Sequence, residues 1–252
     1  MKKKWVFEMI LGFLTISFSS LILGAENTSL DLGSSYNRYS QVEQDLTKEL
    51  PSLRDEVKTI LKTLNQKGTL PENLKSLADD IVLLDSIVGR VREDPNFDEV
   101  EASLDQINNS LKQAQNAYRK NQLGQARALL KKSAIYTKIL IESPLLKMTQ
   151  AEIDMDQAST RIGNKDYVAA GLFINQALDH LQGMQIQGNM KLNDQLAQIK
   201  NKLVVLHQQT ILGKYKDDQD SRSIWKNMRQ VQVDSLSHYY DMWSNTYNPI
   251  EP

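Results

Sequence analysis

The amino-acid sequence predicts an all-α protein whose antiparallel helical hairpins form an elongated bundle, followed by a separate C-terminal helix. Three observations support this fold class. Apolar residues recur at steps of three and four along nearly the whole chain after residue 35, as the buried stripe of a helix requires. Glycine and proline stand mostly between these stretches, where helices end and begin. No stretch shows convincing alternation of apolar and polar residues, the pattern of a strand.

The N-terminus has the parts of a secretory signal peptide. Lysines at positions 2–4 precede an apolar run from Trp5 to Leu23. A basic start, an apolar core and a small residue before a polar stretch are typical of a cleaved signal. We expect cleavage after Ala25, with Gly24 as a second site. An uncleaved membrane anchor is the alternative, although the apolar run is somewhat short for a transmembrane helix.

Polar stretches divide the remaining chain into four parts. Residues 26–35 are polar and contain glycine and serine, and we expect them to form a disordered linker. A helical bundle is expected over residues 36–213. A charged linker at residues 214–220 leads to an aromatic-rich C-terminal helix at 221–252.

The bundle begins with two expected helices. Apolar residues between Val42 and Leu64 form the stripe of the first. Pro51 falls inside this stripe, so a kink or a helix restart near Leu50 is expected. Pro71 suits the first turn of the second helix, which carries its stripe from residue 74 to 91.

Two helical hairpins are expected next, at about residues 104–142 and 145–182. Each has two apolar stripes separated by a short polar turn. Ser143 provides an N-cap and Pro144 a first helical position between the hairpins. A further helix then carries leucines from Leu192 to Leu206 and ends at Gly213.

The two hairpins align with each other at an offset of 44 residues. The aligned segments, Ala114–Ala134 and Ala158–Leu178, each end one helix, turn through polar residues and start another with an alanine. Alanine at a helix crossing lets two backbones approach closely. This packing is similar to that of tetratricopeptide repeats, although their usual period is about 34 residues. Internal duplication and independent convergence on the same packing both account for the alignment.

One stretch resembles a known family. Residues 138–182 contain an apolar run, Pro144-Leu145, a helix, the turn residues 164–167 and a closing helix rich in alanine and leucine. This pattern resembles the C-terminal half of the bacterial YfdX family, and the preceding hairpin extends the resemblance to about residue 103. The resemblance implies a helical exported protein without established enzymatic activity, linked to periplasmic stress tolerance and with a suggested chaperone-like role. It implies no functional residue.

The sequence shows no catalytic or metal-binding pattern, so we predict that the protein is not an enzyme. The absence of cysteine excludes disulfides, thiol catalysis and a lipid anchor on cysteine. The three histidines lie in different helical segments without a chelating partner four residues on: His180, His207 and His238. We therefore expect no catalytic residue, no metal site and no cofactor.

A ligand-binding bundle is the alternative function. Packed helices would be able to bring His180 or His207 beside a methionine, where a haem or another small ligand binds between helices. A purified protein with neither a Soret absorption band nor bound metal would contradict this alternative.

The charge balance gives no reason to expect a nucleic-acid partner. The formal net charge is −1, and signal cleavage moves it to −3 because three lysines and Glu8 leave. No second apolar run is long enough to span a bilayer, so no stable membrane anchor is expected after cleavage.

The C-terminal helix is the one segment that suggests a binding surface. It concentrates large aromatic residues, among them Trp225, Tyr239, Tyr240, Trp243 and Tyr247. Packing of the helix on the bundle is one interpretation, and a partner-binding or self-association surface is the other, because tryptophan and tyrosine dominate binding hot spots. The helical spacing favours packing on the bundle, but Tyr240 and Tyr247 lie beside or off the packed face, and we expect both to remain at least half exposed.

Together these observations predict a non-catalytic, soluble periplasmic protein, or a secreted one if the cell has no outer membrane. Its expected role is that of a binding, scaffold or chaperone-like protein, in tolerance of envelope stress. The expected partner is another protein or a second copy of the chain.

Overall fold

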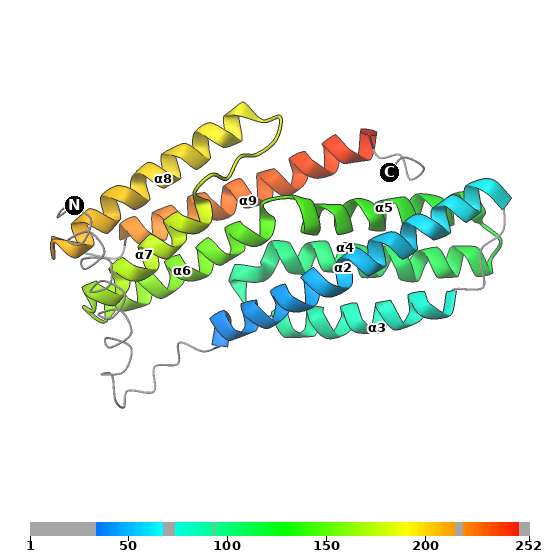
Figure 1. Ribbon diagram of the computed structural model, residues 1–252, viewed down its shortest axis with the longest axis horizontal. Coiled ribbons are helices and arrows are strands. Elements are labelled where there is room, and N and C mark those ends of the chain that lie inside the picture. Colours follow the sequence, from blue (N-terminus) through cyan, green and yellow to red (C-terminus); the bar gives the residue numbers. More distant parts are fainter. Residues whose placement is uncertain (1–33, 68–73, 93, 215–218, 247–252) are drawn as a thin grey trace, which may run out of the picture. The chain divides into compact units, whose positions relative to one another are not determined.

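The computed structural model describes residues 34–67, 74–92, 94–214 and 219–246. These residues form eight α-helices and one 3-10 helix with no strand among them, which confirms the all-α class. In chain order (Figure 1) the elements are α2 (Ser34–Lys67), α3 (Leu74–Val91), η1 (Pro95–Phe97), α4 (Asp98–Arg119), α5 (Leu123–Glu142), α6 (Leu145–Gly163), α7 (Tyr167–Leu181), α8 (Met190–Ile211) and α9 (Gln219–Thr246). The predicted signal peptide lies outside the described residues.

The first helix, α2, continues through Pro51 without a restart. Its apolar stripe is continuous across this position, because Leu50 and Leu53 are both buried. Near its N-terminal end, the hydroxyl of Tyr39 donates a hydrogen bond to the carbonyl of Leu146 on α6, with an O–O distance of 3.2 Å. The burial of the stripe thus brings this helix onto the common core.

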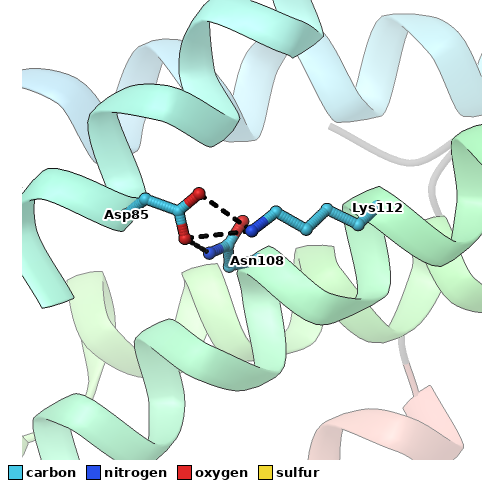
Figure 2. Close-up of polar contacts among 3 residues, drawn as sticks. All are labelled: Asp85, Asn108 and Lys112. Atoms are coloured by element: carbon cyan, nitrogen blue, oxygen red, sulfur yellow. Dashed lines mark hydrogen bonds and ion pairs between the residues drawn. The ribbon is translucent and has the colours of Figure 1, made fainter.

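A polar cluster joins α3 to α4. Figure 2 shows the carboxylate of Asp85 on α3 between two side chains of α4, Asn108 and Lys112. The Lys112 ammonium lies 2.8 Å from Oδ2 of Asp85. Hydrogen bonding to Lys112 lowers the pKa of Asp85 below its ordinary value, and the amide of Asn108 acts in the same direction. The cluster sets the register between the two helices.

The two predicted hairpins are confirmed as α4–α5 and α6–α7, and their turns have the same backbone geometry. Asn121 and Lys165, which are 44 residues apart, both have positive φ angles, 58° and 60°. The amide after each donates to the carbonyl five residues earlier, Gln122 to Ala117 and Asp166 to Arg161, at 2.9 Å in both hairpins. These bonds close the end of the first helix in each hairpin and reverse the chain.

The alanines of the repeat lie where close helix packing requires them. Four are buried at matching positions: Ala114, Ala126, Ala158 and Ala170. Because alanine adds almost no side chain, the helices of each hairpin can pack backbone to backbone. The shared geometry is compatible both with internal duplication and with independent convergence of the two hairpins.

The C-terminal helix, α9, is not separate from the bundle. It packs against α5, α6 and α8, and it begins at Gln219, two residues before the expected start. Its buried face includes Ile224, Met228 and Val231. No helix among the described residues is both long and apolar enough to cross a bilayer.

Helix α6 lies at the centre of these contacts. It packs against α4, α5, α7, α9 and η1, and all residues from 148 to 155 are buried. A helix surrounded on all sides is normally apolar throughout. This one instead carries three buried polar side chains within five residues, Gln150, Glu152 and Asp154.

Candidate functional site

The aromatic residues of α9 pack onto neighbouring helices. Trp225 is partly buried, and its indole N–H donates to Oδ1 of Asn96 at 3.1 Å. The guanidinium of Arg229 lies over the same ring, 5.2 Å from its centroid. Arg229 also pairs with Asp98 at the start of α4. Trp225 thus fastens α9 to the η1–α4 corner.

The second aromatic group lies one to two turns before the end of α9. The hydroxyl of Tyr239, which is buried, accepts a hydrogen bond from the backbone amide of Gln187 at 3.1 Å. Its ring lies 5.0 Å from that of Trp243, which Lys138 of α5 covers at 4.8 Å. Both aromatic side chains therefore serve the packing of α9.

Tyr240 is only partly exposed, and its ring lies 5.0 Å from that of Tyr136 on α5. The expectation that at least half of Tyr240 would be exposed is therefore wrong. The physical reason is the ring of Tyr136, which covers a side of Tyr240 that the apolar stripe of α9 does not bury. Tyr247 lies outside the described residues. Partner binding by these aromatic residues stays a prediction.

A groove between α8 and α9 is a better candidate for a binding surface. It contains a depression of about 350 Å³ and a second of about 150 Å³, and both are lined by Lys202. We call this the α8–α9 groove. Its lining comprises Gln195, Gln198, Ile199, Asn201, Lys202, Val205, Leu206 and Gln209 of α8, and Asp220, Ser223, Ile224, Asn227, Gln230 and Val231 of α9.

The groove combines aliphatic and amide side chains. The aliphatic group is Ile199, Val205, Leu206, Ile224 and Val231, and six asparagine and glutamine side chains lie among them. An amide both donates and accepts hydrogen bonds. Oε1 of Gln195 is buried without a hydrogen-bond partner among the described residues.

Exposed aliphatic residues extend this surface towards α7. On α8 and just after it, Val204, Val205, Ile211 and Leu212 are all exposed, and Val168 and Leu172 are exposed on α7. Ile211 lies over α7 at Gly171, where a Cβ added to the glycine would lie 3.5 Å from Cγ1 of Ile211. A cluster of exposed aliphatic side chains on adjoining helices is typical of a protein-binding surface.

The three histidines occupy three different environments. Nε2 of His180 lies 3.3 Å from the carboxylate of Asp154. His207 lies beside Gly171, and Nε2 of His238 contacts the carbonyl oxygen of Gln187 at 2.7 Å. Within the described part of the chain, no group of three or more histidine, aspartate or glutamate side chains is placed to hold a metal ion.

Buried carboxyl groups on α6 form a second polar feature. Glu152 and Asp154 are both fully buried. Burial raises the pKa of Glu152 well above its ordinary value, and the nearby Glu99 of α4 raises it further. Burial also raises the pKa of Asp154, while His180 opposes this shift. Both carboxyl groups are enclosed by neighbouring helices.

Sequence reasoning missed both features because each depends on pairing between helices. Asp154 meets His180 across the α6–α7 hairpin, whereas spacing within one helix reveals only neighbours three and four residues away. The sequence does contain one indication of the exposed surface, namely two pairs of adjacent aliphatic residues, Val204-Val205 and Ile211-Leu212. In each pair at least one aliphatic residue lies off the buried stripe of α8.

In the comparisons with known proteins, no family model, no curated protein and no solved structure matches this chain.

Proposed function

We propose that this chain is a non-catalytic protein of the cell envelope that binds amphipathic helical segments of other proteins, in a scaffold or chaperone-like role under envelope stress. The observation that carries the proposal is the α8–α9 groove, with its aliphatic and amide lining and the exposed aliphatic residues beside it. The signal-peptide pattern and the resemblance of residues 103–182 to the YfdX family support the location and the link to stress.

The groove fits a helix because its two walls are themselves neighbouring helices. A third helix laid between them buries side chains spaced three, four and seven residues apart. Val205 is exposed and offers apolar contact in the larger depression, whereas Ile224 and Val231 line the two depressions as buried side chains. The amide side chains tolerate many polar neighbours, which suits a protein that accepts more than one partner.

Peptide binding to a surface variant tests this proposal. The probe is a fluorescent amphipathic peptide with leucines at helical spacing, and the comparison is a scrambled peptide of equal composition. Val205→Glu places a carboxylate in the apolar part of the groove and should weaken binding at least about tenfold, equivalent to about 1.4 kcal/mol. Fluorescence anisotropy measures the dissociation constants.

Val82→Glu is the matched control, because Val82 is an equally bulky exposed residue but lies on α3. It should bind the peptide as the wild type does. A second assay follows the aggregation of reduced insulin. The chaperone-like role would be supported if the wild type and Val82→Glu suppress this aggregation and Val205→Glu does not. Equal binding of both peptides, or equal loss in both variants, would contradict the proposal.

A further inference from the structure

Helix α6 carries two buried carboxyl groups that the proposed binding function does not use. In the described part of the chain, neither carboxylate oxygen of Glu152 has a hydrogen-bond partner. A buried ionised carboxylate without partners is costly, because the protein interior replaces none of its hydration. The same side chain in its protonated form is much less costly. The structure therefore favours a proton on Glu152.

The second carboxyl group, that of Asp154, lies on the side of α6 that faces α7. It is fully buried, and Nε2 of the partly exposed His180 lies 3.3 Å from Oδ2. Burial disfavours an ionised carboxylate at Asp154 and raises its pKa, although contact with His180 partly offsets this shift. The folded state therefore favours a proton on Asp154.

Among the described residues of the elements around α6, His180 is the one basic group that acts on these two carboxyl groups. Helix α4 contributes Glu99, whose negative charge raises the pKa of Glu152 further. Asp94, which caps η1, is acidic as well: burial raises the pKa of Asp156, and Asp94 raises it further. The contact from α9 is neutral, because the Gln232 amide donates to Oγ1 of Thr149 at 2.8 Å. The contact from α2 is the Tyr39 hydroxyl.

Helix α5 brings one cation and one anion near its C-terminal end. Lys138 and Glu142 lie on the same face and pair with each other at 3.6 Å. This internal pair leaves no net charge to offset a carboxylate on α6.

We propose that α6 is a proton-operated clamp. Protons on the buried carboxyl groups of Glu152 and Asp154 hold α6 tightly against α4 and α7, and loss of these protons loosens the packing of both helices on α6. The clamp closes in acid and relaxes as the pH rises.

The direction in which stability changes with pH follows from the stronger proton binding of the folded state. Both carboxyl groups hold a proton more tightly when folded than when unfolded. The folded state therefore gains stability as the pH falls through the folded-state pKa values, and this gain is complete below the ordinary carboxyl pKa of about 4. Each unit by which a folded pKa exceeds the unfolded value increases the folding constant tenfold in acid relative to neutral pH.

Hydrogen exchange of the whole protein, followed by mass spectrometry between pH 5 and pH 8, tests the clamp. After correction for the intrinsic exchange rate, protection of amides in residues 148–155 of the wild type should be at least about tenfold higher at pH 5 than at pH 8. Glu152→Gln should remove most of this dependence, because glutamine has nearly the same shape and does not ionise.

Asp154→Asn provides a second, independent variant, and it should remove the part of the dependence that involves α7. Asp194→Asn, at an exposed position on α8, is the matched control and should leave the dependence unchanged. Equal protection of residues 148–155 at both pH values in the wild type would overturn the proposal. So would an unchanged pH dependence in both Glu152→Gln and Asp154→Asn.

Discussion

At the scale of single residues, Asp80 shows how a partly buried carboxyl group can limit stability. It lies on α3, and burial raises its pKa from 3.8 to about 6, with Glu56 of α2 adding a further increase. The negative charge of Glu56 on the neighbouring helix disfavours ionisation of Asp80. This contrasts with Asp85 on the same helix, whose pKa is lowered by Lys112.

Asp80→Asn should therefore stabilise the protein at pH 8 and have little effect at pH 4.5. The folded pKa lies above the ordinary one, so stability is present while Asp80 is protonated and is lost as the pH rises through about 6. Asparagine keeps the neutral state at every pH. Melting temperatures at the two pH values measure this. An equal increase at both would show that charge is not the cause.

At the scale of elements, the hairpins were predictable because their determinants are local. Helical spacing of apolar residues and the alanines at 126 and 170 identify both hairpins, and the structure bears them out. The pairing of Asp154 with His180 was not predictable. At an offset of 44 residues, these positions match Ser110 and Tyr136, so the first hairpin has no ionisable acid–imidazole pair at the matching place.

The candidate site could be predicted less well than the fold. Periodicity identifies the buried stripe of α8, but it does not tell which side of that helix a neighbour covers. Val204 and Ile211 look like additional core positions until the arrangement of α7 and α9 is known. For the same reason, Tyr240 was expected to be exposed, although Tyr136 covers it from a helix about 100 residues earlier.

The turn of the second hairpin places a lysine in a strained backbone conformation. Lys165 has a φ angle of 60°, a region that costs a residue with a side chain about 1–2 kcal/mol. Lys165→Gly should raise the free energy of unfolding by up to about 1 kcal/mol, because the relief of strain exceeds the added chain entropy. Urea denaturation measures the change.

Asn121→Gly at the matching turn is the comparison. Asparagine tolerates the left-handed region better than lysine, so this change should have a smaller effect. A loss of stability in Lys165→Gly would show that the lysine side chain contributes more than its backbone conformation costs.

At the scale of the whole molecule, α9 is the element that ties the two hairpins together. It packs against α5 of the first hairpin and α6 of the second, and it also forms one wall of the α8–α9 groove. Side-chain hydrogen bonds hold α9 to the rest of the chain at two places. Trp225 bonds to Asn96 before the first hairpin, and Tyr239 accepts from Gln187 after the second.

Deletion of residues 219–252 should therefore unfold much of the bundle rather than merely remove a binding surface. The deletion uncovers the apolar partners of Ile224, Met228, Val231 and Trp243, and each large buried side chain is worth about 1.5–3 kcal/mol. A few such losses equal the usual stability of a domain, about 5–15 kcal/mol. Circular dichroism during heating should show a broad, early transition. Removal of residues 247–252 alone keeps every described contact and is the control. If the larger deletion melts cooperatively at the wild-type temperature, α9 is dispensable for folding, and its aromatic residues serve a partner instead.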